Sequence, residues 1–174
     1  MKNNKLVVLL MLSFFCINIS AAERKYKIEL LVFSQDMATT EVFEQADSQI
    51  KWPRHVSPLS SYKKVNSSLM KLTGSYNRLV KGQNYQPLMH VAWVQSVQSN
   101  SLSRAVKISN PQGNITGFFR LQRGHLVHMI ADIEYSKDSV IYRLNEKRRF
   151  KLNETHYLDH PKFGVLAIVS PISD

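Results

Sequence analysis

Cysteine is nearly absent from this chain, which has one, Cys16, in 174 residues. A single thiol excludes a disulfide framework and any cysteine-rich zinc module. No apolar run beyond the N-terminus approaches the roughly 20 residues that a membrane-spanning helix needs. The hydrophobic fraction of 44% excludes a disordered chain, and the length suits one compact domain with its own core.

Signatures of common enzymes are also missing. The sequence contains no glycine-rich phosphate loop, no serine nucleophile elbow and no HExxH zinc motif. Glu29, Asp132 and Glu134 fall in expected strands, but nothing in the sequence selects a catalytic pair of carboxylates. We therefore predict a protein that is not an enzyme, with no catalytic residues and no cofactor.

Acidic residues are missing from Ser48 to Ala131, a stretch that carries 11 Lys and Arg. The whole chain has 23 Lys and Arg against 13 Asp and Glu, a formal net charge of +10. One interpretation is a basic face for an anionic ligand or partner. The other is a solvated surface that happens to use Ser, Asn and Gln as its polar residues. The sequence leaves both open.

The N-terminus has the pattern of a secretory signal peptide. Lys2 and Lys5 precede an apolar run from Leu6 to Phe15, and the small residues Ser20-Ala21-Ala22 follow. We expect a signal peptide at residues 1–22 and one mature domain at residues 23–174.

Export has consequences for the partner. Cleavage after Ala22 removes Cys16 and leaves a mature chain without thiols, which suits an oxidising bacterial periplasm. The chromosome and transcripts lie on the other side of the membrane, so no nucleic acid is expected as a partner. An anionic cell wall or membrane surface is the expected partner instead, and no transmembrane span is expected in the mature chain.

Periodicity predicts mostly strands after the signal. Alternating or continuous apolar runs indicate strands at 26–33, 87–97, 115–122, 125–135, 140–144 and 163–169, with a short edge segment at 103–108. Helical spacing predicts one helix at 67–80, and residues 34–66 are expected to form a long loop with one helical turn near Thr40–Gln45. The expected fold class is α+β, a mostly antiparallel β-sheet with one or two helices in a single domain.

The densest group of reactive side chains is His156-Tyr157-Leu158-Asp159-His160. His and Asp are ligands of transition metals, so a metal-dependent periplasmic hydrolase using His156, Asp159 and His160 is the alternative function. Pro161 follows directly and indicates a turn, not a helix that aligns the two histidines. We favour the turn, in which Asp159 accepts nearby backbone N–H groups, and we expect no metal site.

A basic cluster, Glu146-Lys147-Arg148-Arg149, precedes this segment. It is either a solvated strand end or a site that reads a carboxylate or phosphate, for which the arginine fork is suited. The candidate residues for binding an anion or a partner are Arg148, Arg149, His156, Tyr157, Asp159 and His160.

These C-terminal residues resemble a known family. The segments 145–149 (NEKRR) and 154–166 (ETHYLDHPKFGVL) are similar to the C-terminal signature of the CsiV family, periplasmic proteins of gammaproteobacteria implicated in peptidoglycan assembly. Trp52-Pro53 resembles a tryptophan element of that family, and Leu88–Gln95 resembles its central strand. The segments 113–121 and 125–135 resemble its hairpin.

The resemblance implies a non-enzymatic factor that associates with peptidoglycan. It further implies support of septal wall synthesis through an outer-membrane lipoprotein that activates a bifunctional penicillin-binding protein. Cell shape and cell division are the processes that such a factor would serve. No single residue of this chain points to the lipoprotein partner.

Overall fold

The computed structural model describes residues 23–35 and 47–172. The expected signal peptide and the helical turn expected near Thr40–Gln45 lie outside these residues. The described chain is mostly strand, and none of its helices is long and apolar enough to cross a membrane. It forms β1 (Glu23–Gln35), β2 (Val56–Pro58), η1 (Leu59–Ser61), β3 (Lys63–Lys64), η2 (Ser67–Leu69), α2 (Thr73–Lys81), β4 (Tyr85–Gln98), β5 (Ser101–Leu102), β6 (Ala105–Ser109), β7 (Ile115–Arg123), β8 (Val127–Lys137), β9 (Val140–Arg149), β10 (Thr155–His160) and β11 (Phe163–Pro171).

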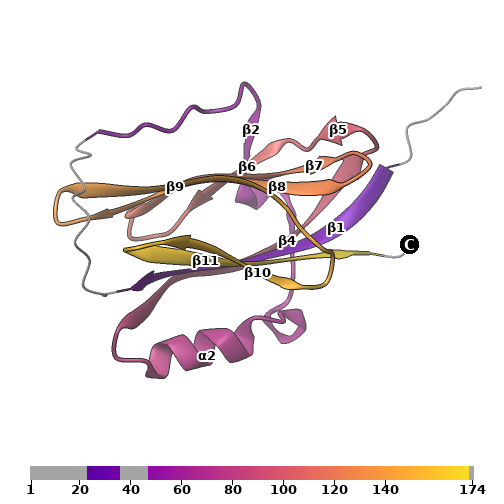
Figure 1. Ribbon diagram of the computed structural model, residues 1–174. Helices are drawn as coiled ribbons and strands as arrows, with labels where there is room; N and C mark the ends of the chain where they lie inside the picture. The colour runs from indigo at the N-terminus through magenta and orange to yellow at the C-terminus, as the bar shows by residue number, and fades with distance from the viewer. Residues whose placement is uncertain (1–22, 36–46, 173–174) are drawn as a thin grey trace, which may run out of the picture.

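The strands form two sheets that pack face to face. Sheet A has the order β10-β11-β1-β4-β3, and sheet B has the order β2-β6-β7-β8-β9, with β5 paired to β7. The pairings are antiparallel except for β2 with β6, which is parallel. Figure 1 shows the two sheets stacked, with α2 on the outer face of sheet A. The chain thus has three layers: helix, sheet A and sheet B.

The sequence of β1 first alternates between polar and apolar residues and then becomes apolar. The surroundings of the two faces of the strand explain this pattern. Tyr26, Ile28 and Leu30 are buried in the core between the sheets. Leu31 points to the other face, where it packs with Leu72 beside α2. Because both faces of β1 are covered, its second half has no solvent-facing positions, as is typical of a central strand.

The main core lies between the sheets. Alternate residues of β4, β7, β8 and β11 point inward and are buried there. Trp93 of β4 is fully buried and meets Phe119 of β7 edge to face, with ring centroids 5.9 Å apart. This large core fixes which side chains of sheet B point outward.

Helix α2 is held on sheet A by a buried carboxylate. Glu29 has no exposed surface and accepts hydrogen bonds from the backbone N–H groups of Lys71 and Leu72, each at 2.8 Å. These N–H groups lie at the N-terminus of α2, where the helix itself offers them no partner and a negative charge is favourable. His90 Nε2 lies 2.8 Å from the same carboxylate. Glu29 therefore joins β1, β4 and α2.

The predicted fold class is confirmed: a mostly antiparallel β-sheet protein with one α-helix in the described chain, in a single domain. The helix is shorter than expected, because residues 67–69 form a separate 3₁₀ turn whose N-cap is Asn66. The sequence did not predict that the strands divide into two sheets.

Candidate functional site

The His156–His160 segment is a strand, and the expectation of a turn there was wrong. Strand β10 pairs with β11 in register from Thr155 opposite Ile168 to His160 opposite Phe163. The turn is confined to Pro161-Lys162 between the two strands. The proline ended the segment as expected, but the residues before it were free to be extended, which is the conformation that a following proline favours.

In a strand, neighbouring side chains point to opposite faces, and this divides the segment. His156 and His160 lie on the core side with Leu158, whereas Tyr157 and Asp159 point to the opposite face. His156 Nε2 lies 2.9 Å from the carbonyl oxygen of Lys151, and the ring of His160 lies 5.1 Å from that of Phe163. The three residues of the hydrolase alternative do not converge, and the described residues include no group of three or more potential metal ligands.

Tyr157 and Asp159 form a hydrogen-bonded group with Gln35 of β1. The Tyr157 hydroxyl donates to Asp159 Oδ1 at 2.5 Å, and Gln35 Nε2 donates to the same oxygen at 3.3 Å. Gln35 Nε2 also donates to the carbonyl oxygen of His160 at 2.6 Å. Burial, and secondly the bond to Asp159, raise the pKa of Tyr157 above its ordinary value. This group ties the outer strand β10 to the central strand β1.

Gly164 explains why the signature continues with phenylalanine and glycine. The Tyr157 ring stacks on Phe33 of β1, with centroids 6.1 Å apart. It crosses Gly164, where an added Cβ would lie 2.6 Å from Tyr157 Cε2 and 2.7 Å from Phe33 Cζ. Only a residue without a side chain fits beneath this stack. The signature thus encodes the packing of β10, β11 and β1.

Arg148 and Arg149 do not form one site, because they point to opposite faces of β9. Arg148 turns toward sheet A and donates to the carbonyl oxygen of Tyr157 at 2.7 Å. Its Nε also lies 2.7 Å from Glu146 Oε1. Arg149 lies opposite His128 of β8 and is exposed on the outer face of sheet B. Arg148 therefore links the two sheets, while Arg149 is available at the surface.

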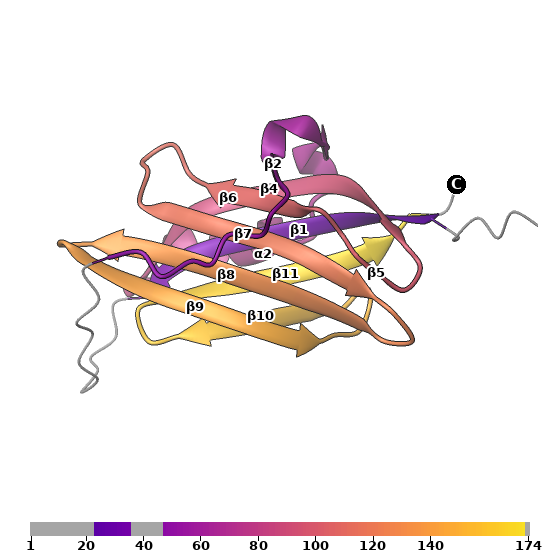
Figure 2. The ribbon, with the colours of Figure 1, turned by 90° about the horizontal axis from the view of Figure 1, so that it is seen from above.

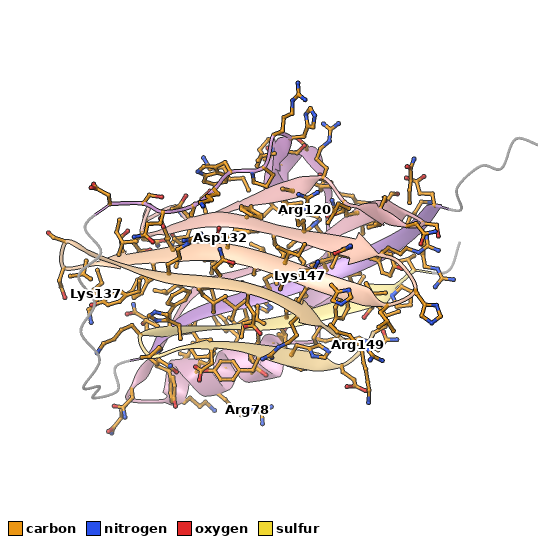
Figure 3. The ribbon with its side chains drawn as sticks, turned by 45° about the horizontal axis from the view of Figure 1, so that its top comes forward. Arg78, Arg120, Asp132, Lys137, Lys147 and Arg149 are labelled. Carbon is orange, nitrogen blue, oxygen red and sulfur yellow. The ribbon has the colours of Figure 1, made fainter. Side chains whose placement is uncertain are left out.

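The outer face of sheet B collects exposed positive charge. Lys107, Arg120, Lys147 and Arg149 all lie at positions that alternate with buried core residues, so they share this face. Arg120, Ile130 and Lys147 stand in one row across β7, β8 and β9. Figure 3 shows Arg120 and Lys147 on this face. Together with Arg54 and Arg104, which flank Arg120, these residues are called the basic face: Arg54, Arg104, Lys107, Arg120, Lys147 and Arg149.

The carboxylates that the strands of sheet B present on this face are buried and engaged. Asp132 is 3% exposed and accepts two hydrogen bonds from Arg143, each at 2.8 Å, and one from Asn145 at 3.2 Å. The bonds to Asp132 raise the pKa of Arg143. Glu134 is 1% exposed and accepts the backbone N–H of Gln49 at 2.8 Å. The charge that these strands offer to solvent here is therefore positive.

An aromatic side chain lies beside the positive charges. Residues 47–55 cross the outer face of sheet B (Figure 2), held there by the bond from Gln49 to Glu134. The Trp52 ring lies 6.1 Å from that of Phe118 and is 44% exposed. An exposed tryptophan supported from beneath offers a flat apolar surface next to Lys107, with which it lines a shallow hollow.

Positive side chains of the acid-free stretch, Ser48 to Ala131, lie on both sides of the molecule. Arg54, Arg104, Lys107 and Arg120 belong to the basic face, whereas Arg78 and Lys81 lie on α2 across the sandwich (Figure 3). The sequence placed Lys147 in the basic cluster, but neither Lys147 nor Arg120 was among the candidate binding residues. Strand alternation was the available signal, since both residues occupy the polar positions of strands whose other face is apolar.

Comparison with protein-family models identifies the chain. The model described as "Peptidoglycan-binding protein, CsiV" matches residues 61–139 and 120–172. The chain belongs to the CsiV family. This match confirms the family predicted from the C-terminal signature, and it covers β9, β10 and β11. Comparisons with curated proteins and with solved structures found no match.

Proposed function

We propose that this CsiV-family protein binds peptidoglycan through the basic face. The family is described as peptidoglycan-binding, and the wall's stem peptides carry carboxylates that an exposed positive surface attracts. The observation that carries the proposal is the row containing Arg120 and Lys147, on a face whose strand carboxylates are buried. Trp52 adds an apolar platform of the kind on which the carbon-bound hydrogens of a sugar ring can pack.

The proposal also assigns a compartment and a role. The signal-like residues 1–22 favour export and removal of that segment, and this supports a periplasmic location for the mature domain. There the protein acts without catalysis and supports septal peptidoglycan synthesis, and through it cell shape and division. The proposed route is an outer-membrane lipoprotein that activates a bifunctional penicillin-binding protein. This finer role is supported by the resemblance of residues 145–149 and 154–166 to the family signature.

Co-sedimentation with isolated sacculi tests the binding. The purified protein is expected to pellet with sacculi at about 50 mM salt. The bound fraction should fall several-fold at about 500 mM, because exposed charges are screened over a few ångströms at high salt. The bound fraction is measured in the supernatant and pellet by gel densitometry. A protein of similar size with an acidic surface serves as the control and should remain soluble. If the protein does not pellet with sacculi at low salt, the proposed binding is contradicted.

A further inference from the structure

Three arginines surround one hollow at the end of the basic face. A cavity of about 330 Å³ is lined by Arg54, His55, Arg104 and Arg120, together with Pro53, Leu102 and Ser103. Among the residues that the structure describes, no carboxylate lines it. A volume of this size lies within the range of small-ligand sites, which bind short polar groups by a few convergent donors. The cavity is therefore a positively charged site of ligand dimensions.

Among the three arginines of the cavity, Arg120 has an unsatisfied hydrogen-bond donor that a ligand could occupy. Its Nε is buried and finds no hydrogen-bond partner within the described parts of the chain. Burial lowers the pKa of this guanidinium, although arginine stays charged in proteins. A buried charged donor without a partner is destabilising, and native structures normally satisfy such groups. By contrast, the guanidinium of Arg143 on the same sheet donates two hydrogen bonds to the carboxylate of Asp132.

We propose that this cavity is a carboxylate-binding site for the peptide stems of peptidoglycan, in which Arg120 binds the carboxylate and Arg54 and Arg104 flank it. The inference rests on the proposed function, since it names the group that the basic face recognises. Guanidinium forks match the geometry of carboxylates and phosphates and bind them by paired hydrogen bonds. The apolar lining from Pro53 and Leu102 favours a peptide, whose aliphatic atoms accompany its carboxylates.

The position of the cavity fits a polymeric ligand. Arg120 stands in the same row of sheet B as Lys147, and Trp52 directly precedes the lining residue Pro53. A glycan strand that lies along the basic face and against Trp52 would have its side peptides within reach of the cavity. Charge alone attracts any polyanion. Recognition of a peptide carboxylate would add specificity for peptidoglycan to this attraction.

Calorimetric titration with soluble wall fragments tests the site. The purified protein is titrated with a disaccharide-tetrapeptide, with the same disaccharide lacking its peptide, and with inorganic phosphate. We expect binding of the peptide-bearing fragment, at least tenfold weaker binding of the bare disaccharide and of phosphate, and at least tenfold weaker fragment binding in Arg120→Gln. The matched control is Arg78→Gln on α2, which should bind as the unaltered protein does.

Stability provides a second readout. Because Arg120 Nε is buried without a partner in the described parts of the chain, Arg120→Gln should leave the melting temperature unchanged or raise it, which a structural arginine would not do. If Arg120→Gln unfolds, the exposed residues Arg54 and Arg104 are changed to Gln together, with the same expected loss. Equal binding of phosphate would overturn the carboxylate assignment, and equal binding of the bare disaccharide would overturn the assignment to the peptide stems. If the protein still pellets with sacculi while no fragment binds, this site is overturned but the proposed function stands. If the protein does not pellet with sacculi, the proposed function is overturned.

Discussion

Replacing Glu29 with alanine is expected to lower the free energy of unfolding by about 3 kcal/mol. The side chain is fully buried and is the acceptor for Lys71 N, Leu72 N and His90 Nε2, all at 2.8 Å. Without it, the N-terminus of α2 faces sheet A with unsatisfied donors. Urea denaturation measures the change. Glu29→Gln keeps one acceptor oxygen and serves as the milder control, and a loss in Glu29→Ala below about 1 kcal/mol would contradict this role.

Glu29 also makes the stability of the domain depend on pH. Burial by itself raises the pKa of Glu29, but the hydrogen bonds from His90, Leu72 and Lys71 outweigh it and hold the pKa below its ordinary value. A carboxyl with a lower pKa in the folded state stabilises the fold above its unfolded pKa of about 4.3, and this contribution is lost as the pH falls through the folded pKa. The melting temperature of the unaltered protein should therefore fall more steeply than that of Glu29→Gln in acid below about pH 4.3.

Charge reversal on the basic face is expected to reduce sacculus binding at least tenfold. The variant Lys147→Glu/Arg149→Glu changes two exposed side chains of β9 that point outward from sheet B. The matched variant Arg78→Glu/Lys81→Glu changes the net charge equally but on exposed positions of α2, across the sandwich. Exposed substitutions of this kind alter stability by about 0.5 kcal/mol or less, so binding is read without unfolding.

The comparison of the two variants separates a specific face from general attraction. Bound fractions are measured by co-sedimentation at one low salt concentration, with melting temperatures as the check on folding. Retention of binding by the α2 variant, with loss in the β9 variant, is the expected outcome. Equal loss in both variants would mean that net charge, not a particular face, holds the protein on the wall.

Much of the fold was predictable because strands of a sandwich carry their own pattern. Alternation and apolar runs located β1, β4, β7, β8 and β11 to within a few residues. The division into two sheets was not predictable, because it depends on pairings between strands far apart in sequence, such as β1 with β11. The sequence did not predict strand β10, because Pro161 indicates a turn and the pairing with β11 is not visible in the sequence.

The candidate site shows a similar division. Arg149 was selected from its basic cluster and lies on the basic face, whereas its neighbour Arg148 is bound to Tyr157 and Glu146. Alternation along β9 separates the two, and this required knowing that residues 145–149 are strand. The sequence does not indicate Arg120, because its partners in the cavity come from two other segments that only the fold brings beside it. Whether the HYLDH side chains also bind a partner stays a prediction.

Lysine footprinting on sacculi tests most directly whether the basic face is the surface that holds peptidoglycan. Lys107 and Lys147 are exposed on that face, and Lys81 is exposed on α2. The protein is acetylated with a limiting amount of reagent, free or bound to sacculi at low salt, and the modified peptides are quantified by mass spectrometry. We expect several-fold protection of Lys107 and Lys147 with Lys81 unchanged. Protection of Lys81 with Lys107 and Lys147 unchanged would contradict it.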